Sequence, residues 1–220
     1  MAYRRTENVI RKLAARQAAI LDSAQVLAAE GGMAAVQVAT VAERAGIAAG
    51  TVYRYFPSKT ELVAAMVEAR AQAEVAVLRR AASAAPGPLS ALAAVIATFA
   101  IRVLANRKLA YALLAEPVES DLESARGGFR RALAADIGAH IRIALGSGHL
   151  PDQDAGIAAS ALVGALIEGL IGPLAPAVDD RAAARAARAQ ALTLFALRAL
   201  GVVDARARGL VAQTQARADG

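Results

Sequence analysis

The fold of this chain is decided by residues 37–59, which read QVATVAERAGIAAGTVYRYFPSK. They predict two short helices joined by a tight turn at Gly46. A glycine one residue past a helix adopts the left-handed conformation most easily, because it has no Cβ. Two helices joined in this way can place the second one in the major groove of DNA. The first helix is expected to bury a face of residues at helical spacing, namely Val38, Val41, Ala42 and Ala45.

The second helix has a clear start and a clear end. Ile47 is apolar directly after the turn and can fill the angle between the two helices. Pro57 ends the second helix, because the residue before a proline avoids the helical region. Ser58 and Glu61 have the capping-box spacing that opens a further helix. The inner face of the second helix is expected to comprise Val52, Tyr55 and Phe56. A helical hairpin with no role at DNA would share much of this pattern.

Three stretches resemble the TetR-type transcriptional regulators. Residues 51–59 (TVYRYFPSK) are similar to the recognition-helix signature of that family, residues 20–32 to its first helix and residues 41–47 to its second. The resemblance covers roughly residues 11–65, and the other two thirds of the chain match only in length and helical character. The resemblance implies an all-α protein, in which a three-helix DNA-binding domain precedes a helical domain for ligand binding and dimerisation.

The pattern of apolar residues along the chain supports this division into domains. We expect a mobile basic arm over residues 1–10 that contains Arg4 and Arg5, and a helix-turn-helix domain over residues 11–58. A helical effector-binding and dimerisation domain follows over residues 59–204, and residues 205–220 are expected to be disordered. The expected helices outside the helix-turn-helix pair cover about residues 11–30, 59–82, 89–104, 107–116, 120–145, 155–172 and 181–200.

Charge and composition agree with a DNA-binding protein of the cytoplasm. The formal net charge is +6, and residues 1–59 alone hold eight Arg and Lys against four Asp and Glu. This basic excess lies where phosphate binding would need it. Cysteine is absent, so neither disulfides nor thiolate metal sites are expected, and the first residues lack the apolar core of a signal peptide.

Two apolar stretches raise the question of a membrane span. Residues 81–101 and 155–178 carry almost no charge, but prolines interrupt both. Both are also rich in Ala and Gly, whereas a spanning helix needs about 20 strongly apolar residues. We therefore expect no contact with a membrane.

The helix over residues 155–172 is apolar on two sides. Val163, Ile167 and Ile171 lie roughly opposite a row of small residues, so the helix should be buried on both sides. One side can face its own core and the other a second copy of the chain, although a central helix of a monomeric bundle would look similar. In TetR-type proteins the last two helices usually dimerise. The expected dimer interface comprises Ala158, Ala161, Ala165, Gly169, Gly172, Leu192, Phe195 and Ala199.

The partner expected for the second short helix is double-stranded DNA. A dimer would present two such helices to the half-sites of a near-palindromic operator. The resemblance implies phosphate contacts from Thr51, Tyr53 and Lys59, and hydroxyl and ammonium groups are suitable donors for them. Arg54 is the candidate for a bidentate contact to guanine, or for a backbone contact. The full set of expected DNA-contacting residues is Thr40, Ala49, Gly50, Thr51, Tyr53, Arg54, Tyr55 and Lys59.

Some of these positions allow a second interpretation. Tyr55 could instead pack inward, and Thr40 could be an ordinary exposed threonine. Ala39, Ala48 and Ala49 stand where the family often has polar or basic residues, so specificity would depend on Arg54, the arm and DNA shape.

The resemblance also implies an effector, a small apolar or amphipathic molecule held among the later helices. Glu168 is the only charge of its helix, and it could bind a ligand, pair with an arginine across the dimer, or face solvent. Aromatic residues here could equally belong to the core, and Arg181, Arg185 and Arg188 form a row that suggests a solvated face. The candidate ligand-binding residues are Phe99, Arg102, Tyr111, Glu116, Phe129 and Glu168.

We therefore expect a ligand-responsive transcriptional regulator, a repressor released from its operator by a population shift. The alternatives are an architectural DNA-binding protein without effector and an all-helical enzyme. Catalysis has little support, because phosphate-binding, nucleophile-elbow and zinc-protease motifs are absent and only two histidines are present. Asp152 and Asp154 could suggest a metal, but helix capping is the simpler interpretation. We expect no cofactor and no metal site.

Overall fold

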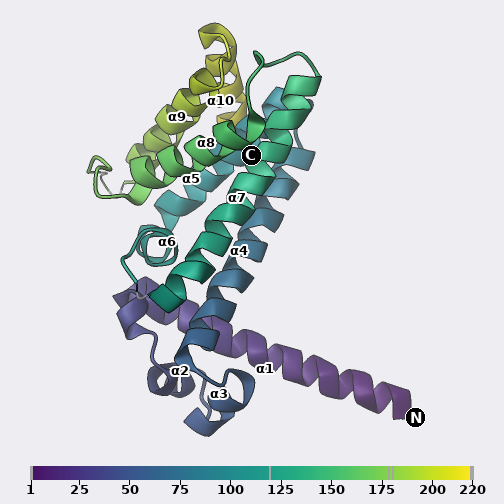
Figure 1. Ribbon diagram of the computed structural model, residues 1–220, viewed down its shortest axis with the longest axis vertical. Helices are drawn as coiled ribbons and strands as arrows, with labels where there is room; N and C mark the ends of the chain where they lie inside the picture. The colour runs from purple at the N-terminus through teal and green to yellow at the C-terminus, as the bar shows by residue number, and fades with distance from the viewer. Residues whose placement is uncertain (1, 119, 178, 180, 219–220) are drawn as a thin grey trace. The chain divides into compact units, whose positions relative to one another are not determined.

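The computed structural model describes residues 2–118, 120–177, 179 and 181–218, and the side chains of residues 9–118, 122–177, 179 and 181–215. These residues form helices and connecting loops without any strand (Figure 1). The chain divides into two compact units. Unit 1 comprises Met1–Arg70 and Lys108–Gly127, and unit 2 comprises Ala71–Arg107 and Gly128–Gly220.

Unit 1 contains the predicted helix-turn-helix pair. Ile20, Ala24 and Ala28 of the first helix are fully buried, as their spacing predicts. Leu62 and Met66 at the start of the fourth helix are also fully buried. The expected boundary at residue 59 falls inside this unit, which continues to Arg70 and includes a second segment. The elements of unit 1 are α1 (Ala2–Gly31), the short 3-10 helix η1 (Met33–Ala35), α2 (Val38–Arg44), α3 (Ala49–Tyr55), the first half of α4 (Lys59–Ser83), α6 (Arg107–Leu114) and the start of α7 (Ser120–Gly146).

Unit 2 is built around one apolar helix, α5 (Pro88–Ala105). The helices α8 (Ala155–Ile171), α9 (Ala182–Ala199) and α10 (Asp204–Ala218) all pack on it (Figure 1). Within the described residues, α5 is also the one helix long and apolar enough to cross a membrane, but 61% of it is buried in the protein. Its composition is therefore that of a core helix.

Two ion pairs connect the helices of unit 2. Arg102 of α5 donates to both carboxylate oxygens of Glu74 on α4, at 2.7 and 3.0 Å, and Glu74 is only 4% exposed. Arg79 of α4 donates to Asp136 of α7 at 2.7 Å. The hydrogen bond to Glu74 raises the pKa of Arg102 against the opposing effect of burial, so the guanidinium stays charged. Glu74 thus has both carboxylate oxygens paired, whereas Asp136 has one oxygen paired and its buried Oδ2 without a hydrogen-bond partner among the described residues.

Both ends of the chain differ from the expectation. A mobile arm is predicted over residues 1–10, but α1 begins at Ala2. Arg4 and Arg5 are part of this helix, and their side chains lie outside the described residues. Because no Gly or Pro occurs between residues 2 and 30, nothing in the sequence stops the helix from continuing toward the N-terminus.

The expected disordered tail over residues 205–220 is wrong, because α10 extends through Ala218. Ala207, Leu210 and Val211 form a helical stripe and are at most 9% exposed. They pack on α5 and α9, and this tertiary burial outweighs the polar composition of the segment. Hydrogen bonds from Arg208 and Arg198 hold the pKa of Asp204 below its ordinary value. These hydrogen bonds stabilise the first turn of α10 at neutral pH, where Asp204 is ionised. The stabilisation is lost when the pH falls through the lowered pKa of Asp204.

Replacing Leu210 by Ala should destabilise the protein by about 2–5 kcal/mol, because a buried isopropyl group and its packing are removed. The measurement is chemical denaturation of the full chain followed by circular dichroism. Gln213→Ala, on the exposed side of the same helix, is the control and should leave the midpoint within experimental error. Equal midpoints for both variants would mean that α10 does not dock in solution.

Candidate nucleic-acid interface

The turn between α2 and α3 has the geometry of a Schellman motif. Gly46 has φ +64°, in the left-handed region. The N–H of Ile47 donates to the carbonyl of Ala42 at 3.0 Å, and the N–H of Gly46 donates to that of Glu43 at 3.1 Å. A Cβ on Gly46 would meet nothing within 4 Å, so the backbone conformation alone explains the glycine. The left-handed turn predicted from the sequence is confirmed.

Small and branched residues hold α2 against α3. Val41 and Val52 are fully buried, and Ala42 is 3% exposed where the two helices come together. Phe56 is buried with an extended backbone before Pro57, where α3 ends as predicted. Ser58 accepts a hydrogen bond from the N–H of Glu61 at 3.1 Å and so caps α4. The orientation of α3 is therefore fixed from both of its ends.

Thr40 caps the first helix of the pair. Its Oγ1 accepts from the N–H of Gln37 at 3.3 Å and lies 3.0 Å from the carbonyl oxygen of Ala35, to which it can donate. The side chain is exposed. Thr40 thus has a structural role, and its expected phosphate contact stays a prediction.

The outer side of α3 carries an exposed tyrosine and a basic side chain. Tyr53 is 51% exposed, and Arg54, Ala49 and Gly50 are also exposed. Neither Arg54 nor Lys59 makes an ion pair with any described residue, whereas Arg44 pairs with Glu30 at 2.6 Å. Two cations beside α3 therefore have no internal counter-charge. Thr51, Tyr55 and Lys59 are half-buried. The expected DNA contact of Tyr55 stays a prediction.

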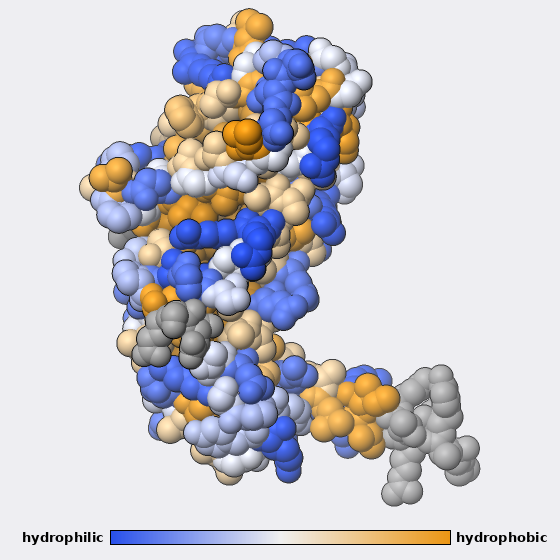
Figure 2. Space-filling model, viewed as in Figure 1, coloured by the Kyte–Doolittle hydropathy of each residue, from blue (hydrophilic) through white to orange (hydrophobic). Residues whose placement is uncertain are grey.

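A hollow of about 420 Å³ lies beside α3, within unit 1. Lys12 and Arg16, one helical turn apart on α1, contribute to its wall together with Arg54. Our sequence prediction missed Lys12 and Arg16, although their four-residue spacing could have indicated a shared face. The N-terminal half of α1 also carries an apolar patch (Figure 2). The remaining lining residues of the hollow are Val9, Leu13, Ile47, Ala48, Thr51 and Tyr55.

Comparison with known proteins assigns this domain. Residues 20–66 match the family model described as "Bacterial regulatory proteins, tetR family". This N-terminal segment is of the TetR type. Over 48 residues it is 56% identical to the HTH-type transcriptional repressor KstR of Rhodococcus jostii (strain RHA1), and 52% identical to the KstR of Mycobacterium tuberculosis (strain ATCC 25618 / H37Rv). Each match covers 22% of this chain and less than a quarter of the relative's own length.

The TetR fold extends over the rest of the chain. The structure of RolR in complex with resorcinol has a TM-score of 0.67, 24% sequence identity, and coverage of 92% of this chain and 95% of that one. The regulator FadR of Bacillus subtilis in complex with stearoyl-CoA also has a TM-score of 0.67, with 17% identity, and covers 82% of this chain and 97% of that one. At these identities the likeness establishes the all-α TetR architecture and not a shared ligand.

Two of the candidate ligand-binding residues lie in unit 1. Glu116 accepts from the N–H of Met33 at 3.0 Å, and a Cβ on Gly32 would lie 2.8 Å from its carboxylate. Its carbonyl also accepts a hydrogen bond from Arg126. Glu116 therefore stabilises η1, and Tyr111 is 39% exposed at the surface.

The other four candidates lie in unit 2 and have structural roles there. Phe99 and Phe129 are buried core residues, and Arg102 is held by Glu74. Glu168 is half-buried and accepts from the N–H of Leu174 at 2.7 Å, so it fixes the loop after α8. Asp154 caps α8 by accepting from the N–H of Ile157 at 2.8 Å, as the capping interpretation predicts. The candidate ligand residues are thus not gathered into one site within either unit.

The two sides of α8 differ in exposure. Val163, Ile167 and Ile171 are buried in unit 2, as predicted. Of the expected interface residues, Ala161 and Ala199 are exposed and Phe195 is 53% exposed, while Ala158, Ala165 and Leu192 are half-buried. A Cβ on Gly169 would lie 2.9 Å from the Leu192 side chain, and one on Gly172 would lie 2.3 Å from the Glu168 carboxylate. Both glycines thus also serve packing within one chain, and their expected place in the dimer interface stays a prediction.

Gly46→Ala should destabilise the domain by about 1–2 kcal/mol, because an L-residue is strained in the left-handed region. Gly50→Ala is the matched control. Gly50 is helical and open, so the added methyl should stabilise by about 0.5–1 kcal/mol. Urea denaturation of both variants measures the difference. If Gly46→Ala were as stable as Gly50→Ala, the left-handed turn would be wrong.

Proposed function

We propose that this protein is a ligand-responsive transcriptional regulator of the cytoplasm, which represses genes by binding a near-palindromic operator as a homodimer. The main support for this proposal is the surface at and after α3. There, Arg54 of α3 and Lys59 at the start of α4 form no ion pair with any described residue. We assign no catalytic role to the protein. Support also comes from the KstR repressors, which match the DNA-binding segment.

In this proposal α3 is the reading helix in the major groove. Thr51, Tyr53 and Lys59 hold phosphates, and Arg54 reads guanine. Ala49 and Gly50 allow the backbone of α3 to approach the DNA closely, because a Cβ on Gly50 would meet nothing of the protein. Lys12 and Arg16 add positive charge on the α1 side of the same hollow. One α3 helix makes few base contacts in this arrangement. Specific binding therefore needs a second α3 helix at a second half-site.

The second half-site requires a second copy of the chain. We place the dimer contact on the outer side of α8 and α9, where Phe195 is exposed beside small residues such as Ala161 and Ala199. A half-exposed phenylalanine with small neighbours suits a close contact between helices, since its ring is removed from water on association. The dimer sets the distance between the two reading helices.

An effector would act by changing that distance. A ligand that binds one arrangement of the subunits more tightly shifts the population toward it. The solved relatives bind molecules as different as resorcinol and stearoyl-CoA, so they support a ligand-binding role without specifying the ligand. An architectural DNA-binding protein would retain its DNA at every ligand concentration.

Lys59→Ala should weaken binding to all DNA sequences alike and lower the slope of log affinity against log salt by about 0.9 for each phosphate that the lysine neutralises. Arg54→Ala should instead reduce discrimination between sequences by about 1–3 kcal/mol per contacted base. Both are measured by fluorescence anisotropy on a genomic fragment selected by the protein. Lys108→Ala, which removes the same charge from the exposed surface of α6, is the control for Lys59. An equal change of slope for the two lysine variants would exclude the phosphate contact.

Phe195→Asp should convert the dimer to a monomer and lower operator affinity by at least about tenfold, because a charge would be buried in the interface. Sedimentation equilibrium gives the oligomeric state. Ile143→Asp is the matched control, since Ile143 on α7 is 54% exposed and lies outside α8 and α9. A Phe195→Asp protein that remains dimeric would place the dimer contact elsewhere.

A further inference from the structure

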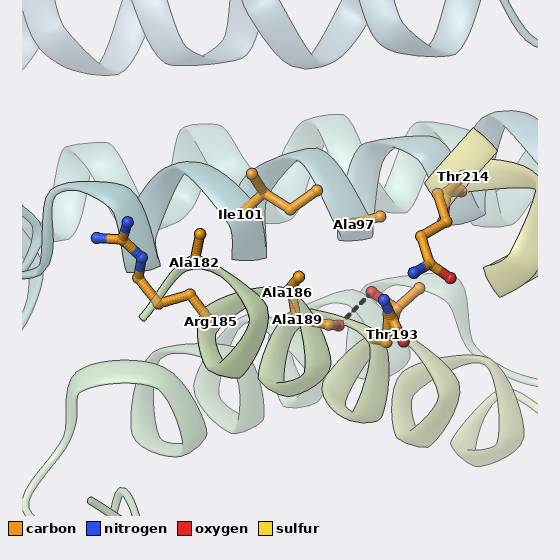
Figure 3. A pocket seen from close by; sticks show the side chains of 10 residues that line it. Ala97, Ile101, Ala182, Arg185, Ala186, Ala189, Thr193 and Thr214 are labelled. Atoms are coloured by element: carbon orange, nitrogen blue, oxygen red, sulfur yellow. Dashed lines mark hydrogen bonds between the residues drawn. The ribbon is translucent and has the colours of Figure 1, made fainter. Parts of the chain in front are cut away.

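Unit 2 contains a hollow that the proposed DNA and dimer contacts do not use. It has a volume of about 220 Å³ and lies between α5, α9 and α10 (Figure 3). Its wall includes Ile101 of α5, four alanines and five polar side chains. The other lining residues are Ala97, Ala182, Arg185, Ala186, Ala189, Gln190, Thr193, Thr214 and Gln215.

The hollow exists because α9 presents methyl groups where larger side chains would fill the space. Ala182, Ala186 and Ala189 are spaced by four and three residues, so they line one face of α9. Ala97 of α5 is another short side chain in the wall (Figure 3). These methyl groups and Ile101 give the hollow an apolar surface, as expected of a site that binds the body of a small molecule.

One cation lies at an end of this apolar wall. Arg185 is half-buried, lines the hollow and makes no ion pair with any described residue. Its neighbour Arg181 is different, because it is 81% exposed and pairs with Asp179 at 2.6 Å. The sequence suggested one solvated face for both, but the structure places only Arg185 at the hollow. A guanidinium with free donors favours a carboxylate, which it can bind with two hydrogen bonds.

The opposite end of the hollow offers polar groups of another kind. Thr193 donates to the carbonyl of Ala189 at 2.7 Å, and Thr214 donates to that of Val211 at 2.7 Å. Both hydroxyl hydrogens are therefore used, and only oxygen lone pairs remain for a ligand. The amides of Gln190 and Gln215 also line the hollow and can donate hydrogen bonds, but they are neutral. Among the lining residues only Arg185 carries a positive charge, so it is the strongest position for an anion. In Figure 3 Arg185 and the two threonines lie at opposite ends of the row.

The volume limits the size of the ligand. An apolar cavity of about 150 Å³ is enough to hold benzene, whereas pockets for drug-sized ligands have about 300–1,000 Å³. A hollow of about 220 Å³ thus fits one ring with a small substituent. Long acyl chains do not fit.

We propose that this hollow binds a small organic carboxylate with an apolar body the size of a single ring, and that Arg185 holds the carboxylate. Binding of the carboxylate does not depend on the proposed function. Only the effect of that binding on DNA affinity rests on the proposed function. That effect has a direct route through α9. Thr193 faces the hollow, while Phe195, about 200° further around the helix, is exposed at the proposed dimer contact. A ligand that displaces α9 therefore moves the dimer contact.

The test is isothermal titration of the full-length protein with benzoate, benzamide and acetate. Benzoate should bind at least about tenfold more tightly than benzamide, which lacks the charge, and than acetate, which lacks the ring. Arg185→Ala should raise the Kd for benzoate at least about tenfold, and Ala186→Leu should abolish binding by filling the hollow. The matched controls are Arg188→Ala and Ala187→Leu, on the same helix but outside the lining, and both should bind as the wild type does.

Circular dichroism of each variant confirms the fold, and Arg185 and Ala186 are both accessible enough for substitution. The proposal is overturned if benzoate does not bind at millimolar concentration, or if it binds both site variants as tightly as the wild type. Retention of genomic DNA by the ligand-free protein is measured separately. A protein that binds benzoate at Arg185 but retains no DNA would refute the proposed function and leave the site intact. A protein that retains DNA but does not bind benzoate would refute the proposed site and leave the proposed function intact.

Discussion

The left-handed backbone at Gly46 is the constraint on which the DNA-binding surface depends. It redirects the chain between Arg44 and Ala49, so that α2 and α3 pack together with Val41, Ala42 and Val52 buried. Once Val52 points inward, Tyr53 is rotated by about 100° per residue and must lie toward solvent. The exposure of Tyr53 and Arg54, which we propose to face DNA, is therefore a consequence of the burial of Val52.

Unit 2 follows a different principle, in which alanine has the main role. Alanine-rich helices can approach one another closely, but they fill space poorly where their axes diverge. The core around α5 includes larger side chains such as Phe99 and Ile96, whereas the hollow between α5, α9 and α10 is lined in part by the short side chains of four alanines. The same composition thus produces tight packing in one place and a potential binding site in another.

Local signals predicted the helix-turn-helix pair accurately, because its determinants lie within a few residues of one another. Gly46, Pro57 and Ser58 act on their own neighbourhood, and each has the predicted role. The errors concern features that depend on distant partners. Leu210 looks like part of a frayed tail until α5 and α9 are placed beside it. The pairing of Arg102 with Glu74 on another helix could not be predicted from the sequence either. The periodicity of a sequence describes one helix at a time. It therefore cannot show which charged side chain of a neighbouring helix will pair with a given residue.

The contact of Glu116 with η1 has a consequence for how such proteins can be recombined. Residues 33 and 116 are 83 positions apart, and the carboxylate of Glu116 occupies the space that a side chain on Gly32 would need. The compact unit that carries the reading helix is therefore discontinuous in sequence. A chimera that grafts only the first 58 residues onto another regulator would leave the N–H of Met33 without its acceptor. A graft that also transfers residues 108–127 would preserve the native surroundings of that amide.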